Sequence, residues 1–432
     1  MKNDITWLSV IGINESKVSG GISELSEQAR SLITEATLVV GGKRHLELAA
    51  DLIKCEAKIW ENPIEKTIEK IIALRPKIVC VLASGDPFCY GVGATLARYI
   101  PISEMLVIPA PSCFSLAAAK LGWALQDVVT IGLNGRAIEK IIPHLQPKAK
   151  IMALSTDETT PALLAELLNK RGFSEAKFLV LEHLGGEKEK IREFTVEGLS
   201  FLRRQESIST LAMVDREIPA YAGRTIEKLN MVAIAIADNA EIKALALPIA
   251  CGLADDLFEH DGQISKREIR AITLSSLAPR KGELLWDIGL GAGSVAIEWL
   301  LCDATNRAIG FEKNPERAAR AARNAFALGV PDLQIIEGSV PDTLQGAEAP
   351  DAIFIGGGAG NHKTIEIAWN VLKSGGRLVV NSVTLETEAV IIAACKQYGG
   401  NIIRIGIERS EAVGSMTGLR PAMSVLQWSI IK

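Results

Sequence analysis

The sequence lacks the cysteine patterns that build disulfide frameworks or zinc sites. Its seven cysteines are an odd number, they are widely scattered, and no two are spaced as Cys-x-x-Cys. We therefore expect neither structural disulfides nor a bound metal ion. We interpret most of the cysteines as small buried apolar residues.

The sequence also lacks long hydrophobic runs and an excess of charge of one sign. The apolar run after Trp7 stops at Gly12, which is too short for a signal-peptide core or a membrane span, so we expect a cytoplasmic protein with no membrane partner. Lys and Arg number 47 against 51 Asp and Glu, a net charge of -4. Because proteins that bind a phosphate backbone are usually basic, nucleic acid is not expected as a partner.

The chain has 432 residues, of which 48% are hydrophobic, enough for two or three domains with apolar cores. Short apolar runs alternate with helical periodicities, which is typical of α/β folds. We predict a domain over 1–237, a linker over 238–261 and a second domain over 262–432. In the first domain we predict strands over 7–13, 37–40, 78–83, 106–108, 150–155, 177–181, 209–214 and 231–237, and helices over 22–33 and 64–74.

The second domain reads as a doubly wound parallel sheet. We predict strands over 284–288, 308–311, 333–336, 352–355 and 377–381, and helices over 266–278, 294–301, 315–328 and 363–372. The strand over 284–288 runs directly into a glycine-rich loop composed of Gly289, Leu290, Gly291, Ala292 and Gly293. Such glycines let a ligand approach the backbone at the end of the first strand, although a tight turn alone could also require them.

Glu312 supports the interpretation that the glycine-rich loop binds a ligand, because it closes the next strand 23 positions after Gly289. An acidic side chain there can accept hydrogen bonds from both hydroxyls of a ribose. The Gly-x-Gly-x-Gly spacing favours a nucleoside without a pyrophosphate, and S-adenosylmethionine (SAM) fits that description. Asp287 could orient the loop or meet the ammonium of the ligand, and it could equally be a helix cap.

Two polar turns follow neighbouring predicted strands of the first domain. One is Ser84-Gly85-Asp86-Pro87 and the other is Pro109-Ala110-Pro111-Ser112. Each could be only a turn. Together, at strand ends of an α/β sheet, they could form the walls of a cleft.

These segments resemble two known families. VLASGDPFCYGVG (81–93) and IPAPSCFSLAAAKLGW (108–123) resemble the tetrapyrrole methylases, in the branch that methylates carbon 5 of precorrin-6. DGQISKREIRAITLSSLAPRKGELLWDIGLGAGSVAIEW (261–299), with FEKNPERAARAARNA and PDAIFIGGG, resembles the class I SAM-dependent enzymes that methylate carbon 15 and decarboxylate the acetate arm at carbon 12. The tandem order is similar to that of the fused, decarboxylating precorrin-6B methyltransferases.

The resemblance implies a tetrapyrrole methylase fold of two α/β subdomains followed by a class I Rossmann-like methyltransferase. It implies SAM in both domains, a tetrapyrrole substrate of cobalamin biosynthesis and a homo-oligomer. No catalytic residue is assigned. The implied SAM contacts are Gly12, Gly85, Asp86, Ser112, Leu133 and Met213 in the first domain, and Ser265, Gly289, Leu290, Gly291, Ala292, Gly293, Glu312 and Val340 in the second.

Two departures from the family patterns and several alternatives stand beside this interpretation. Gly338-Ser339 occupies the place where many class I enzymes have an aspartate, and the usual longer glycine motif near the start is only Gly12-Ile13-Asn14-Glu15. The rivals are a nucleic-acid methyltransferase, a non-catalytic SAM-binding scaffold and a nicotinamide oxidoreductase. The sequence leaves open whether the ring contains cobalt.

The candidates for binding the carboxylates of the substrate are Arg267, Arg270, Arg377, Arg404, Arg409 and Arg420.

Overall fold

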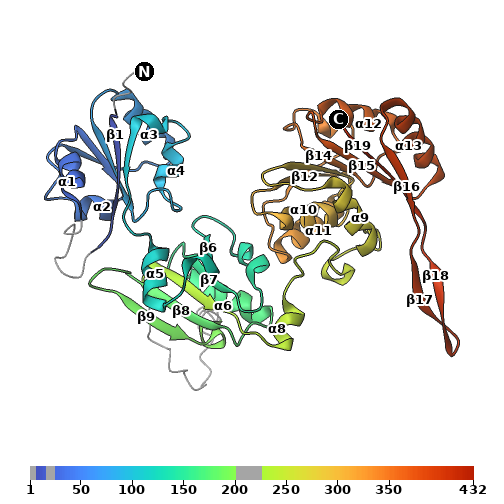
Figure 1. Ribbon diagram of the computed structural model, residues 1–432, viewed down its shortest axis with the longest axis horizontal. Helices are drawn as coiled ribbons and strands as arrows, with labels where there is room; N and C mark the ends of the chain where they lie inside the picture. Colours follow the sequence, from blue (N-terminus) through green and yellow to red (C-terminus); the bar gives the residue numbers. More distant parts are fainter. Residues whose placement is uncertain (1–5, 16–24, 201–225) are drawn as a thin grey trace, which may run out of the picture. The chain divides into compact units, whose positions relative to one another are not determined.

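A computed structural model describes residues 6–15, 25–200 and 226–432. The chain divides into two compact units (Figure 1). The first comprises Met1–Ile138 and Gln146–Leu245, and the second comprises Glu139–Leu145 and Ala246–Lys432. The predicted strand over 209–214 lies outside the described residues, and so does Met213.

The first unit begins with a parallel sheet in the order β3-β2-β4-β1-β5. Helices cover both faces of this sheet: α3 and α4 pack on one face, and α1 and α2 pack on the other (Figure 1). The strands are β1 (Leu8–Ile13), β2 (Leu38–Gly41), β3 (Glu56–Ile59), β4 (Val79–Ser84) and β5 (Met105–Ile108), and the helices are α1 (Glu27–Thr34), α2 (Lys43–Leu48), α3 (Glu65–Ala73) and α4 (Val92–Leu96).

A mixed sheet in the order β6-β7-β10-β8-β9 completes the first unit. Because β10 is antiparallel to both β7 and β8, the ends of β7 and β8 share one edge with the start of β10. Helix α5 buries Phe114 and Ala117 against this sheet. The elements are β6 (Val128–Gly132), β7 (Lys150–Leu154), β8 (Lys177–Glu182), β9 (Lys190–Phe194), β10 (Asn230–Ala235), α5 (Cys113–Leu121), α6 (Thr160–Lys170) and α8 (Ala240–Leu245).

The second unit is built on a seven-stranded sheet in the order β13-β12-β11-β14-β15-β19-β16. Strands β11 to β15 are parallel, and β19 runs antiparallel between β15 and β16. The strands of this sheet are β11 (Leu284–Ile288), β12 (Arg307–Glu312), β13 (Gln334–Glu337), β14 (Ala352–Ile355), β15 (Arg377–Ser382), β16 (Asn401–Ile405) and β19 (Val425–Ile431). Strands β17 (Glu408–Val413) and β18 (Met416–Pro421) form a separate two-stranded sheet.

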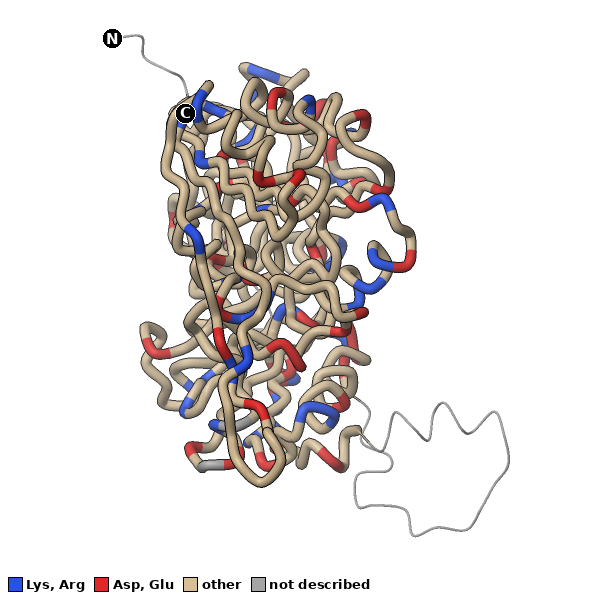
Figure 2. Tube along the Cα trace, turned by 90° about the vertical axis from the view of Figure 1, so that its right-hand side faces the viewer, with Lys and Arg blue, Asp and Glu red and all other residues tan. Residues whose placement is uncertain are grey.

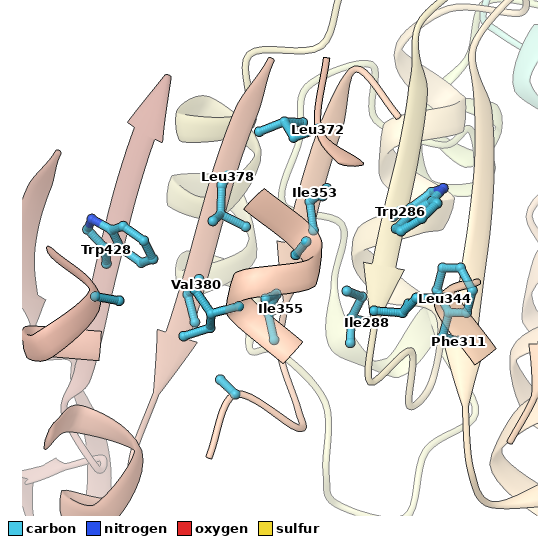
Figure 3. Close-up of a cluster of buried hydrophobic side chains, with 14 of the residues drawn as sticks. Trp286, Ile288, Phe311, Leu344, Ile353, Ile355, Leu372, Leu378, Val380 and Trp428 are labelled. Atoms are coloured by element: carbon cyan, nitrogen blue, oxygen red, sulfur yellow. The ribbon is translucent and has the colours of Figure 1, made fainter. Parts of the chain in front are cut away.

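The core of the second unit lies between this sheet and helices α12 and α13. Side chains from four parallel strands and β19 meet there, and Figure 3 shows Trp286, Ile353, Leu378 and Trp428 along this face. The helices are α9 (Arg267–Leu277), α10 (Ser294–Cys302), α11 (Pro315–Ala327), α12 (His362–Val371) and α13 (Leu385–Tyr398). The predicted fold class, two α/β subdomains followed by a Rossmann-like domain, is confirmed by the three sheets.

Short 3-10 helices occur in the connections of both units. They are η1 (Ile102–Glu104), η2 (Leu125–Asp127), η3 (Ile138–His144), η4 (Asp255–Leu257) and η5 (Asp342–Leu344). Among the described residues, no helix is both long enough and apolar enough to cross a membrane. Lys and Arg are interspersed with Asp and Glu along the chain in Figure 2, so that charges of opposite sign offset one another locally.

Burial corrects one expectation about the cysteines. Cys80 is fully buried, but the others are only partly buried or exposed, so the prediction that most of them lie in the core is wrong. Cys251 and Cys302 are both exposed, and their sulfur atoms are 3.8 Å apart. The apolar neighbours of a cysteine in the sequence therefore do not determine whether its side chain reaches the core.

The predicted linker contains structure that belongs to both units. Helix α8 groups with the first unit, whereas Leu253 and Phe258 are buried in the second. The N–H groups of Gly252 and Leu253 donate to Glu298 of α10 at 2.6 and 2.9 Å, and Arg270 of α9 donates to the carbonyl of Leu253. This anchored segment should therefore be part of any stable fragment of the second unit.

We predict that a fragment of residues 246–432 folds, whereas one of residues 262–432 is destabilised by about 3–5 kcal/mol or does not fold. The shorter fragment loses the buried Leu253 and Phe258 and leaves Arg270 and Glu298 without several of their hydrogen-bond partners. Urea unfolding followed by circular dichroism measures the difference. Equal stabilities would contradict the anchoring role of residues 252–258.

Candidate functional site

The glycine loop of the second unit follows β11 and has no room for side chains at its start. Gly289, Gly291 and Gly293 all have positive φ angles. A Cβ on Gly289 would lie 2.6 Å from both the nitrogen and the Cα of Gly357, in the turn after β14. The loop therefore holds two strand ends in backbone contact, at the carboxyl edge where ligands of such sheets bind.

Glu312 closes β12 beside this loop and is 5% exposed. One carboxylate oxygen accepts from the N–H of Gly291 at 2.8 Å, and the other accepts from the N–H of Asn314 at 3.0 Å. A carboxylate has about four lone-pair sites, so two remain for ligand hydroxyls. The structure thus brings the predicted glycine loop and the predicted acidic residue together.

The remaining predicted contacts of the second unit lie around the same loop. A Cβ on Gly291 would be 3.8 Å from the carbonyl oxygen of Gln263, two residues before Ser265. Val340 is partly buried, and its side chain lies next to Gly358 in the turn after β14. Segments from before α9 and after β13 therefore flank the loop.

Asp287 lies beneath the glycine loop and is 1% exposed. Its Oδ2 accepts from the N–H of Ala296 in the first turn of α10 at 3.1 Å, while Oδ1 is buried without a partner among the described residues. Burial raises the pKa of Asp287 to about 8, and the nearby charge of Glu312 adds to the rise, against a lowering by the Ala296 N–H. Asp287 therefore caps α10 through one oxygen, and its other oxygen is buried without a partner among the described residues.

In the first unit, three predicted positions meet at the carboxyl ends of β1, β4 and β5. A Cβ on Gly12 would lie 1.9 Å from the carbonyl oxygen of Gly85 and 2.6 Å from the nitrogen of Ala110. Gly85 has a φ of +56°, and its own Cβ would lie 3.1 Å from the Cα of Ser112. Gly12, Gly85 and Ser112 are therefore held in backbone contact.

A cleft of about 470 Å³ opens beside these residues, between the two sheets of the first unit. Gly85, Asp86 and Ser112 line it from the first sheet. Residues at the shared edge of β7, β8 and β10 line the other side, and the buried Ser155 Oγ and Asn230 Oδ1 have no partner among the described residues. Unpaired buried polar atoms in a cleft favour a polar ligand.

Two other predicted residues of the first unit have structural partners. Asp86 Oδ1 accepts from the N–H of Phe88 at 2.8 Å, which is the bond of an Asx turn. Leu133 is fully buried behind the cleft wall: it donates to the carbonyl of Leu154 at 3.1 Å and accepts from the Thr156 hydroxyl at 3.0 Å. Leu133 therefore supports the wall, and its neighbour Asn134 lines the cleft.

Most of the arginines considered for substrate carboxylates have acidic partners within the second unit. Arg270 is fully buried against Glu298, and Arg377 is 4% exposed and paired with Glu283. The other pairs are Arg404 with Glu388, Arg409 with Glu268, and Arg420 with Glu411. Because Arg270 and Arg377 are buried and already paired, they are not available to bind a carboxylate of the substrate.

Sequence reasoning missed a polar cluster in the cleft of the first unit. Arg44 and His45 follow β2, and Ser84 ends the neighbouring β4. Arg44 also forms an ion pair with Glu15 at 2.7 Å. The sequence feature that could have indicated this cluster is the Gly41-Gly42 turn, because it follows an apolar strand, as the two recognised turns do.

Comparisons with known proteins agree with this two-part geometry. The tetrapyrrole (corrin/porphyrin) methylases match residues 19–200, and the precorrin methyltransferase domain matches residues 256–432. A Sinorhizobium protein named precorrin-6Y C(5,15)-methyltransferase [decarboxylating] is 49% identical over 99% of this chain and 96% of its own length. A Mycobacterium tuberculosis protein of the same name is 34% identical over 98% of this chain and 99% of its own length.

A solved structure is similar to part of this chain. It is the C-terminal domain of precorrin-6Y C5,15-methyltransferase from Rhodobacter capsulatus, with 40% sequence identity and a TM-score of 0.41. The match covers 43% of this chain and all of that chain.

We predict that Asp287 makes stability fall as pH rises. Its pKa is about 8 in the folded state against 3.8 for an ordinary aspartate, so the folded protein holds the proton more tightly and is favoured at low pH. Between pH 5 and pH 8 the wild type should lose roughly 3–4 kcal/mol relative to Asp287→Asn. Urea unfolding at the two pH values tests this, with the exposed Asp256→Asn as the matched control. Parallel pH curves for wild type and Asp287→Asn would disprove it.

Proposed function

Because the chain belongs to the decarboxylating precorrin-6Y C(5,15)-methyltransferases, we propose that each of its two units binds one SAM and methylates the same tetrapyrrole. The first unit transfers a methyl group to carbon 5. The second transfers one to carbon 15 and decarboxylates the acetate arm. The observation that supports this division is that in each unit a glycine at the end of a parallel strand packs directly against the backbone of a neighbouring turn. The sequence-based prediction of a decarboxylating precorrin methyltransferase of cobalamin biosynthesis is confirmed.

The residues of the second unit fit the nucleoside and amino-acid parts of SAM. Glu312 would accept from the ribose hydroxyls through lone pairs that its two backbone bonds leave free. The partly buried Val340 offers an apolar surface for the adenine, and the buried Asp287 supports the loop by capping α10. Gly289 holds the loop against the turn after β14, since a Cβ there would clash with the backbone of Gly357.

The first unit fits the same molecule with different groups. Gly85 and Ser112 form one wall of its cleft, and the unpaired Ser155 Oγ and Asn230 Oδ1 lie in the opposite wall. This proposal places Gly12, Asp86 and Leu133 in support of those walls. Met213 stays a prediction, because it lies outside the described residues.

Bound SAM supplies an electrophilic methyl group on its sulfonium. The residues of the chain hold the acceptor carbon in line with that group and exclude water from the path, which is the main requirement of such a displacement. The cleft of the first unit lies between two sheets, so it can close on both faces of a flat ring. We assign no proton-transfer residue to decarboxylation, and His362 lies exposed at the first position of α12.

The test of this function is product mass after incubation with SAM and precorrin-6. The wild type should give two methyl gains and one lost carboxyl group. Glu312→Ala should weaken SAM binding in the second unit by about 1–3 kcal/mol, because the ribose hydroxyls lose a charged acceptor, and should shift the product to one methyl gain with the carboxyl retained. Glu316→Ala, an exposed carboxylate in the first turn of α11, is the matched control. Decarboxylation at the wild-type rate in Glu312→Ala would contradict the assignment.

We also propose that two copies of the chain associate through the hairpin of β17 and β18. This hairpin forms its own two-stranded sheet with open edges, and it carries Val413, Met416 and Leu419 at 64%, 76% and 69% exposure. Exposed apolar side chains on an unpaired hairpin favour a protein partner, and a second copy offers the same surface in return.

Met416→Glu combined with Leu419→Glu should therefore lower the assembly state. The added charges would have to be buried without partners if the hairpins still met, which costs several kcal/mol. Sedimentation velocity of the full chain measures the change, and Ser374→Glu, in an exposed turn of the same unit, is the control. A wild type that sediments as a monomer would rule the interface out.

A further inference from the structure

Three polar side chains converge on one point in the cleft of the first unit. Arg44 and His45 come from the start of α2, just after β2, and Ser84 is the last residue of β4. Because β2 and β4 are neighbouring parallel strands, their carboxyl ends lie side by side. All three side chains line the cleft.

Two donors meet at the hydroxyl oxygen of Ser84. Arg44 Nη2 donates to Ser84 Oγ at 3.0 Å, and His45 Nε2 is 2.7 Å from the same oxygen. The N–H of Gly42 donates to His45 Nδ1 at 3.3 Å, so Nδ1 carries no proton. Burial and then the charge of Arg44 lower the pKa of His45 to about 4, so the ring is neutral and its single proton is on Nε2.

Ser84 is therefore left with a proton to donate. A hydroxyl has two acceptor lone pairs and one donor hydrogen, and Arg44 and His45 occupy both lone pairs. The side chain is exposed to the cleft, and no described residue accepts its hydrogen. The acceptor must come from the solvent or from the ligand.

We propose that Arg44 and His45 position Ser84 to donate a hydrogen bond to a carboxylate of the ligand bound in this cleft. Arg44 is ion-paired with Glu15 at 2.7 Å through Nη1, which fixes the guanidinium and offsets the charge of Glu15, and Lys228 also lines the cleft. A carboxylate bound here accepts from Ser84 beside the guanidinium of Arg44. It belongs either to a side chain of the tetrapyrrole or to the amino-acid end of the methyl donor.

This inference rests on the proposed carbon-5 methylation, and an isosteric pair of variants tests it in the full chain. Ser84→Asn keeps a donor at the position, whereas Ser84→Asp places a carboxylate of the same shape there. With precorrin-6 as substrate, Ser84→Asn should keep the KM for carbon-5 methylation within about 10-fold of wild type. Ser84→Asp should raise the KM about 100-fold or more, with little change in kcat, because two carboxylates would then face each other.

The two sources of the carboxylate give different results. A raised KM for the tetrapyrrole with unchanged S-adenosylhomocysteine binding assigns it to the substrate. Weaker S-adenosylhomocysteine binding in the first unit, measured by calorimetry, assigns it to the methyl donor. If Ser84→Asp and Ser84→Asn have the same KM and the same binding, no carboxylate binds here and the inference is overturned. A wild type that does not methylate carbon 5 would instead contradict the proposed function.

The positioning role of His45 has its own test. His45→Leu removes the donor that holds Ser84 and should raise the KM about 10-fold without lowering kcat, and His45→Gln, which can still donate, should restore it. Ser31→Ala, an exposed hydroxyl on α1 outside the cleft lining, should behave as wild type. If the Gln and Leu variants are equally impaired in kcat, His45 has only a structural role.

Discussion

Backbone packed directly against backbone at the ends of parallel strands is the constraint on which both candidate sites depend. In the first unit a Cβ on Gly12 would lie 1.9 Å from a carbonyl oxygen of the turn after β4, and in the second a Cβ on Gly289 would lie 2.6 Å from Gly357. Any side chain at either position would separate the strand ends that carry the site. The same glycines therefore hold the loops together and leave the space beside them to a ligand, so these two roles cannot be separated at these positions.

A buried ion pair, Arg270 with Glu298, connects the segments that surround the second site. Arg270 and Glu298 are 0% and 2% exposed, and their other partners are the Asp255 carboxylate and backbone groups of Gly252, Leu253 and Ser265. The network thus connects α9, α10, residues 252–253 and the segment beside the glycine loop. Losing one partner would leave a charge buried without compensation, which is far more costly than losing a surface ion pair. This is why Arg270 cannot turn outward to bind a substrate carboxylate.

The bounds of strands and helices were predicted most accurately where the spacing of apolar residues and a capping residue indicate the same boundary. The bounds of β11 were predicted without error, and α11 begins at Pro315 because Asn314 caps it through bonds to two backbone N–H groups. Edge strands such as β3 and β9 were missed, since their exposed charged residues do not alternate as buried strands do. The Ser84 cluster was missed for a different reason. Its residues lie about 40 positions apart, and they meet only because β2 pairs with β4, a pairing that no local pattern shows.

The two sites would recognise the same methyl donor with opposite chemistry. The second unit presents an acceptor: Glu312 keeps free lone pairs, whereas the buried Asp287 is protonated at neutral pH because its pKa is raised to about 8. The first unit presents a donor at Ser84, with Arg44 beside it. Ligand hydroxyls are therefore favoured at the second site and an anionic part of a ligand at the first. If the carboxylate at Ser84 belongs to the methyl donor, the two sites hold that donor by different groups: its amino-acid end in the first unit and its ribose in the second.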